Sequence, residues 1–239
     1  MFKTTLAAAA FACVALSSFA QAGTIIISGP GFSSAALTAT SAAGAGTSPF
    51  ALGNFGNAGT NGLVSSNPIS LANGTITFTP NGSTPHAGVY DGNVSGVAAS
   101  PFNGTNLTAS NYLVAEPNDP VKIDFNSTQF GFNLLWGTVD MFNSLNLDFR
   151  NDSTSLFKLT VTGNQVAQAI GGGFQANGSN QAFVSLFELP GFNEIIATST
   201  QSAFEFVPGV QVPEPASLAL LGMGLAGLGL ARRKAARAS

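Results

Sequence analysis

Cysteine and histidine are almost absent from this chain of 239 residues. Its only cysteine is Cys13 and its only histidine is His86. Zinc sites and nucleophile–histidine triads are built from several such side chains held together, and this chain cannot supply them. We therefore expect no enzyme activity of these kinds, no metal site and no cofactor.

Charged residues are also scarce and make up 8% of the chain. Between residues 23 and 212 the only basic residues are Lys122, Arg150 and Lys158, among a larger number of acidic ones. Proteins that bind nucleic acid neutralise its phosphates with basic side chains, so this composition excludes nucleic acid as a partner.

The first 22 residues are typical of a secretory signal peptide. Lys3 supplies a positive charge, residues 6–19 are apolar, and Ala20 and Ala22 form a small-x-small cleavage site directly before Gly23. We expect export through the secretion translocon and a mature chain that begins at Gly23. The single cysteine would leave with the signal peptide, so the mature protein would have no thiol.

Residues 212–239 contain a proline-rich triplet, an apolar run and a basic end, in that order. A helix over the apolar run would reach about 24 Å, slightly less than a hydrocarbon core of about 30 Å, so we expect one short transmembrane helix. Basic residues stay in the cytoplasm, which places the body of the protein outside. The three features are Pro213-Glu214-Pro215, residues 216–231, and the tail 232–239 with Arg232, Arg233, Lys234 and Arg237.

This tail resembles the PEP-CTERM sorting signal of bacterial surface proteins. The resemblance implies transient insertion in the inner membrane, processing by an exosortase, and delivery to the cell surface or the extracellular matrix. It also implies an association with exopolysaccharide and biofilm. An ordinary C-terminal tail anchor is the alternative interpretation.

Residues 23–211 are predicted to form one all-β body. Residues 23–110 are rich in Gly, Ser, Thr and Asn, and only Thr24–Ser28 and Thr75–Thr79 have the pattern of strands, so we expect long loops around two or three strands. Residues 111–211 are strand-dense, with residues 165–170 either a strand or a short helix. Their alternating patterns predict an antiparallel β-sandwich or a jelly-roll-like fold. The expected strands are Tyr112–Ala115, Val121–Phe125, Phe130–Trp136, Leu145–Phe149, Leu156–Val161, Ala182–Phe187, Glu194–Thr198 and Ala203–Val207.

Residues 130–145 include Trp136, Gly137, Asp140 and Asn143 in a compact motif. The motif resembles one found in a subgroup of exosortase-dependent surface proteins, with an aromatic-Gly-aromatic strand followed by Trp-Gly-Ser/Thr and an Asp. That subgroup has no established activity, so the resemblance implies location and fold rather than chemistry.

Two interpretations of this motif are open. In the structural one, Phe130, Phe132 and Trp136 fill the core, Gly137 makes a tight turn, and the Asp and Asn brace a corner between strands. In the functional one, Trp136 is an exposed surface for sugar stacking, and Asp140 and Asn143 bind sugar hydroxyls. We favour the structural interpretation, because a single tryptophan in a β-rich domain is usually buried.

Acidic residues leave two further possibilities. A glycosidase needs only two carboxylates. It would place one of Asp124, Asp140 or Asp148 in a cleft beside a second carboxylate, and burial would raise the pKa of that aspartate. We expect these three side chains to cap turns or lie on the surface instead. A structural calcium ion would use oxygen ligands from the set Asp91, Glu116, Asp119, Asp124 and Asp152, although no EF-hand loop is present.

These patterns together predict a non-enzymatic exported protein of the cell surface or the exopolysaccharide matrix. A carbohydrate-binding adhesion module, marked by an exposed aromatic cluster, is the first alternative. A secreted glycoside hydrolase is the second.

Overall fold

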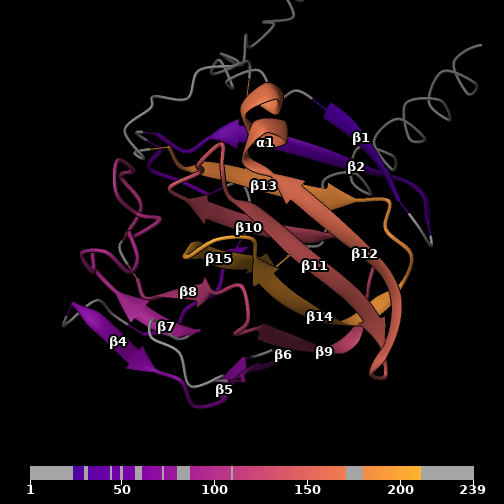
Figure 1. Cartoon of the computed structure of the whole chain (residues 1–239), viewed down its shortest axis with the longest axis horizontal. Coiled ribbons are helices and arrows are strands. Elements are labelled where there is room, and N and C mark those ends of the chain that lie inside the picture. The colour runs from indigo at the N-terminus through magenta and orange to yellow at the C-terminus, as the bar shows by residue number, and fades with distance from the viewer. Residues whose placement is uncertain are drawn as a thin grey trace, which may run out of the picture.

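The described strands of this protein form two antiparallel sheets, and one short helix lies in the same part of the chain (Figure 1). The computed structural model describes residues 24–29, 32–43, 45–48, 51–56, 61–71, 73–79, 87–108, 110–170 and 180–210. The expected signal peptide, the expected transmembrane run 216–231 and His86 lie outside these residues. In the described part of the chain, no helix has the length and the apolar character needed to cross a membrane.

One sheet contains nine of the described strands and the other contains six. The order in the first is β1 (Thr24–Gly29), β2 (Phe32–Ser41), β13 (Ala182–Phe187), β10 (Phe132–Gly137), β15 (Phe204–Val210), β8 (Tyr112–Ala115), β7 (Gly88–Asp91) and β4 (Gly62–Ser65), with β3 (Ala51–Leu52) also paired to β15. The order in the second is β12 (Thr154–Thr162), β11 (Ser144–Asn151), β14 (Phe192–Ser199), β9 (Val121–Gln129), β6 (Gly74–Phe78) and β5 (Ile69–Leu71). The prediction of a mainly antiparallel β-protein is confirmed.

The strands from β8 to β15 alternate between the two sheets in a regular way. Their order is β8, β15, β10, β13 in the larger sheet and β9, β14, β11, β12 in the smaller one. Only β11 and β12 follow each other within one sheet, as a hairpin. Every pairing in this set is antiparallel.

Alternation along the strands builds one core between the sheets. In β11, Leu145, Leu147 and Phe149 are buried, whereas the polar residues between them are partly exposed. They share a hydrophobic cluster with Leu134 and Trp136 of β10, from the opposite sheet. Successive side chains of a strand point to opposite faces, so this pattern places one face of each sheet in the common core.

The larger sheet has a second apolar cluster on its other face. Leu135 of β10, Tyr112 of β8 and Phe183 of β13 belong to it, together with Phe102 and Ala98 from the segment that follows β7. The segment between β7 and β8 therefore covers the outside of the larger sheet. This explains why β8 and β10 are buried along their whole length rather than at every second residue.

The N-terminal half contains more strands than the sequence predicted. Seven strands, β1 to β7, lie in the described residues before position 110, against the two or three that we expected. The expectation failed most clearly at β2, which is ten residues long and composed mainly of Ser, Ala and Thr. Such small side chains give little strand signal. Pairing with β1 and β13 on its two sides holds this segment in the sheet.

The segment that could have been a strand or a helix forms α1 (Gly163–Ala169). Thr162 and Gln165 make a capping box, in which the Gln165 amide N–H donates to the Thr162 hydroxyl at 3.1 Å. The Thr162 amide in turn donates to the Gln165 side chain at 2.8 Å. These bonds satisfy free N–H groups at the start of the helix. α1 packs at one edge of the body near β2 and β12, and β4 and β5 lie at the opposite edge (Figure 1).

Candidate functional site: a groove at one end of the sheets

The tryptophan of the 130–145 motif is a core residue. Trp136 is 1% exposed, and its ring centroid lies 4.4 Å from that of Phe204 on β15. Phe132 is also buried, but Phe130 is 66% exposed in the turn between β9 and β10. The expectation that Phe130 fills the core was wrong, because this residue lies before the strand begins. The burial of Trp136 agrees with the structural interpretation and makes it unavailable for sugar stacking.

Gly137 is needed for close packing rather than for a turn. It is the last residue of β10, and a Cβ atom at this position would lie 2.4 Å from Cα and Cβ of Pro101. Real Cβ atoms do not approach other atoms so closely, so only glycine fits here. The next residue, Thr138, makes the turn with φ of 44°. Our expectation that Gly137 forms the turn was therefore wrong by one residue.

Asn143 joins two segments that follow different strands. Its side-chain amide donates to the carbonyl of Ala203 at 2.7 Å, and its side-chain oxygen accepts from the Ser144 amide at 2.8 Å. The residue is buried, and Gly163 at the start of α1 donates to its carbonyl at 3.2 Å. This is the bracing of a corner that the structural interpretation describes for Asn143. The same expectation for Asp140 was wrong, because its side chain makes no such bond in the described residues.

A groove of about 500 Å³ opens beside this corner. Its walls come from three parts of the chain: the segment 93–99, the turn after β10, and residues 202–205. The volume lies within the range of small-molecule binding sites in proteins. The side chains used below are Asn93, Thr138, Asp140, Ser202 and Glu205.

Glu205 forms the buried wall of the groove. It is 5% exposed; the Ala99 amide donates to its Oε1 at 2.9 Å, and the Thr138 hydroxyl donates to its Oε2 at 2.8 Å. Burial raises the pKa of Glu205 from 4.5 to about 7, although these two hydrogen bonds act in the opposite direction. Near neutral pH this carboxyl is therefore divided between its protonated and ionised forms.

Asp140 lines the same groove and differs from Glu205 in its contacts. It is partly buried, and burial raises its pKa above the usual value. Within the described part of the chain, no side chain or backbone group forms a hydrogen bond or ion pair with its carboxylate. Its charge also contributes to the raised pKa of Glu205. Contrary to our expectation, Asp140 thus lies in a cleft beside a second carboxylate.

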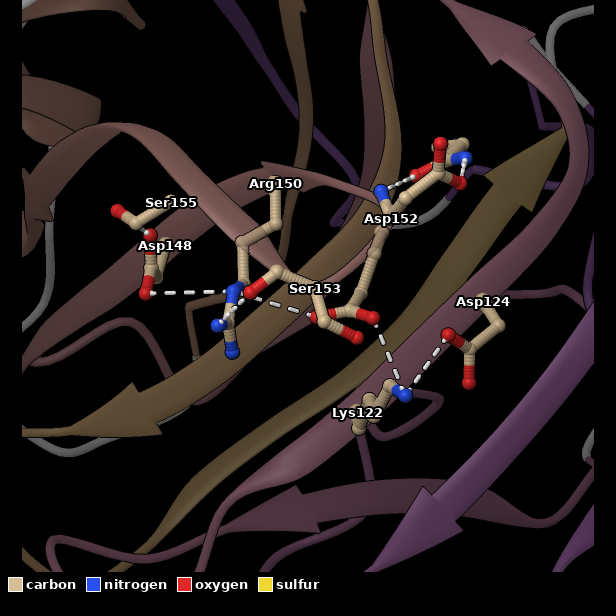
Figure 2. A network of polar contacts seen from close by, with 9 residues as sticks. Lys122, Asp124, Asp148, Arg150, Asp152, Ser153 and Ser155 are labelled. Carbon is tan, nitrogen blue, oxygen red and sulfur yellow. Dashed lines mark hydrogen bonds and ion pairs between the residues drawn. The ribbon is translucent and has the colours of Figure 1, made fainter.

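Asp124 and Asp148 lie elsewhere, in a charged network on the outer face of the smaller sheet (Figure 2). Nζ of Lys122 is 3.0 Å from Asp124 and 3.1 Å from Glu194. Nε of Arg150 is 3.3 Å from a carboxylate oxygen of Glu194 and 4.0 Å from one of Asp148. The contact with Glu194 is an ion pair that lacks the geometry of a hydrogen bond. Each of these carboxylates has a cation beside it, and neither Asp124 nor Asp148 lines the groove of Asp140 and Glu205.

The carboxylates considered for calcium are dispersed. Glu116 and Asp119 pair between β8 and β9, where an Asp119 carboxylate oxygen accepts from the Ala87 amide at 3.0 Å. Asp91 belongs to β7, and Asp152 bonds to Asn193 at the end of the β11–β12 hairpin. In the described residues, no three acidic, histidine or cysteine side chains gather in a way that could hold a metal ion.

Sequence reasoning did not single out Glu205, Thr138 or the segment 93–99. One local signal was present, because Glu205 is an acidic residue in the otherwise apolar run from Phe204 to Val207. A charged side chain inside such a strand suggests a special environment. The segment 93–99 had no signal of this kind, since its place beside β10 depends on the fold.

The groove lies at the opposite end of β15 from the C-terminal tail. Residues 211–234, which begin directly after this strand, match the family described as the PEP-CTERM protein-sorting motif. The chain carries a PEP-CTERM sorting motif. The motif implies export, membrane-associated sorting outside the cytoplasm, and an exosortase as the processing partner. The PEP-CTERM match includes Pro213, Glu214 and Pro215 and the first basic residues of the tail. No curated protein and no solved structure gives a significant match to the chain.

Proposed function

We propose that this chain is a non-enzymatic protein of the bacterial surface or extracellular matrix that binds exopolysaccharide through the groove beside Asp140. The sorting motif at residues 211–234 is the observation that carries this proposal, since it directs the body out of the cell. The proposal includes a cleaved signal peptide, one transient transmembrane helix over residues 216–231, and release by exosortase cleavage. The final location is the surface or the biofilm matrix.

The topology of the two sheets is one that binding proteins use. The strand order from β8 to β15 is that of a double-sheet jelly roll, an architecture that also occurs in lectins. A fold of this kind hosts many functions, so a binding role depends on the side chains of the groove itself. The groove offers the carboxylate of Asp140, which has no hydrogen-bond partner among the described residues, and polar neighbours at Asn93 and Ser202; these groups can bind sugar hydroxyls.

The position of the groove suits a protein that is held at its C-terminal end. Glu205 and Val210 lie near opposite ends of β15, and the sorting motif begins one residue after Val210. The groove therefore lies at the end of β15 that is remote from residue 210, where the chain continues into the sorting motif. A polysaccharide outside the cell could then reach Asp140 and its neighbours.

Co-sedimentation with the host's own exopolysaccharide tests this proposal. The exported, processed protein should sediment with the polymer, and Asp140→Asn should weaken this retention. Asp152→Asn is the matched control, because it makes the same chemical change at a hairpin far from the groove while its side-chain oxygen can still accept the bond from Asn193. Equal retention of both variants and the parent would place binding outside the groove, and no retention at all would contradict the proposal.

A glycoside hydrolase is the second candidate function, and one observation favours it. Asp140 and Glu205 line one groove, and burial raises the pKa of both carboxyls. A glycosidase uses a carboxyl of raised pKa as acid and a second carboxylate as base or nucleophile. Both oxygens of Glu205 already accept internal hydrogen bonds, which favours a binding role over catalysis. Release of reducing ends from the exopolysaccharide, abolished by Glu205→Gln or Asp140→Asn in a folded protein, would establish the hydrolase instead.

A further inference from the structure

The described part of the body separates its positive charge from the groove. Its basic residues are Lys122, Arg150 and Lys158. The first two belong to the network on the outer face of the smaller sheet (Figure 2). Lys158 lies on the same face, opposite Asp148 in the neighbouring strand. None of the three lines the groove. The groove therefore presents negative charge with no cation of the described chain beside it.

The two carboxyls of the groove are not equally available to a ligand. Both oxygens of Glu205 accept bonds from within the protein, from the Ala99 amide and the Thr138 hydroxyl. Asp140 has no such partner in the described residues, although it is partly withdrawn from water. A partly desolvated carboxylate without a donor is stabilised by any ligand that brings a positive charge or a hydrogen-bond donor. Asp140 is therefore the group through which a ligand gains most.

We propose that the groove binds a sugar carrying a free primary amine, with its ammonium group against Asp140 and its hydroxyls against the polar wall. The inference rests on the proposed function and names the class of glycan. An ammonium group supplies the charge that the groove lacks and can donate three hydrogen bonds. Sugars with carboxylate, sulfate or phosphate groups are disfavoured, because no described cation near the groove offsets their charge.

A divalent metal ion fits the same charge less well. Calcium takes about six to eight oxygen ligands, and magnesium requires near-octahedral geometry. Only Asp140 offers an unoccupied carboxylate, and no described cluster of three acidic residues surrounds it. A ligand with one positive charge and several hydroxyl groups matches this arrangement of one free and one occupied carboxylate.

Isothermal titration of the exported, processed protein at pH 7 with two matched probes tests the inference. The probes are a tetramer of β-1,4-linked glucosamine, whose free amines can carry a positive charge, and its fully N-acetylated counterpart, whose amides are uncharged. The amine form should bind at least about tenfold more tightly, since a hydrogen bond to a charged group contributes that much. Asp140→Asn should remove the difference between the probes, and Asp152→Asn should preserve it.

Proton release on binding distinguishes an effect of the ammonium charge from a change in the shape of the groove. Glu205 is faced by the Ala99 amide, the Thr138 hydroxyl and the carboxylate of Asp140, and its charge also acts on the Tyr112 phenol of the neighbouring strand β8. An ammonium group nearby favours its ionised form, so binding should release protons at pH 7. The binding enthalpy should then differ between buffers with different ionisation enthalpies. Glu205→Gln should remove this dependence on buffer.

Each contrary result has a distinct meaning. Equal affinity for the two probes would overturn the role of the amine and leave sugar binding in the groove intact. Binding of neither probe, with exopolysaccharide still retained in an Asp140-dependent way, would overturn the inference but not the proposed function. Titration with calcium chloride completes the test, because calcium binding that Asp140→Asn abolishes, without binding of the amine probe, would identify a cation site instead.

Discussion

Gly137 and Glu205 are register partners on the neighbouring strands β10 and β15. This pairing places the middle of the 130–145 motif against the strand that leads into the sorting signal. Thr138, one residue beyond the pair, then donates its hydroxyl to Glu205. The motif therefore shapes the end of the body where the groove lies.

Processing at both ends is the first prediction. The secreted protein should begin at Gly23 and lack the apolar run that starts at Ala216. Intact-mass spectrometry of secreted material measures both ends at once. Replacing Pro213-Glu214-Pro215 with three alanines should leave the precursor in the inner membrane. Secreted protein that still contains residues 232–239 would contradict processing by an exosortase.

Trp136→Ala should lower the free energy of unfolding by about 3–5 kcal/mol, as expected for a large aromatic side chain removed from a core. The ring packs against Phe204 and is almost fully buried. Phe142→Ala is a control in the same motif, because Phe142 is 60% exposed. This substitution should lower the free energy of unfolding by less than about 0.5 kcal/mol. Urea unfolding of both variants measures the difference. Similar costs for the two would be inconsistent with the packing described here.

Gly137→Ala should destabilise the protein by about 1–3 kcal/mol through overpacking. The added methyl group would meet the backbone of Pro101, which cannot move aside as a flexible side chain could. Gly46→Ala provides the control, since the nearest atom to its added Cβ would be 3.9 Å away. Thermal unfolding of the two variants should show a lower midpoint only for the first, and an unchanged midpoint for Gly137→Ala would show that this contact is not limiting.

The protein should lose stability as the pH rises from about 4.5 to about 7. Burial raises the pKa of Glu205 from 4.5 to about 7, so in this window the folded protein keeps a proton that the unfolded chain has released. The contribution is fully present below the unfolded pKa and is lost as the pH rises through the folded one, on the order of 3 kcal/mol in total. Urea unfolding at a series of pH values measures the slope.

Glu205→Gln should flatten that pH dependence, because the amide does not titrate. Glu188→Gln changes an exposed glutamate outside the groove and should leave the slope unchanged. A slope that persists in Glu205→Gln would assign it to another carboxyl, such as Glu116, whose pKa burial also raises.

Glu194→Gln should cost about 1.5–3 kcal/mol of unfolding free energy, the range for a hydrogen bond or contact to a charged group. Glu194 is buried and lies within ion-pair distance of both Lys122 and Arg150, so its loss removes the negative charge that these two cations share. Asp124→Asn affects only Lys122 at a more exposed position and should cost less than about 1 kcal/mol. Chemical unfolding compares the two. Equal losses of unfolding free energy in the two variants would contradict a larger contribution of Glu194 than of Asp124.

Several parts of this protein could be predicted from the sequence because they depend on local chemistry. The sorting signal is a linear pattern of prolines, apolar residues and basic residues, so it can be recognised from the sequence alone. The strands after residue 111 were also predictable, since their alternation and β-branched residues act over a few positions. The helix at residues 163–169 remained undecided, because its signal depended on the capping pair Thr162 and Gln165.

The tertiary structure decided the features that depend on distant segments. Small residues in β2 became a strand because β1 and β13 pair with it, and Phe130 became exposed because β10 begins two residues later. The groove combines residues 93–99, 138–140 and 202–205, which no sequence pattern connects. The two carboxyls of the groove also differ in their contacts: Glu205 accepts hydrogen bonds from Ala99 and Thr138, whereas the described residues give Asp140 no donor. Residue type and order determined where the protein is sent, whereas packing determined which carboxyl of the groove accepts hydrogen bonds from within the described body.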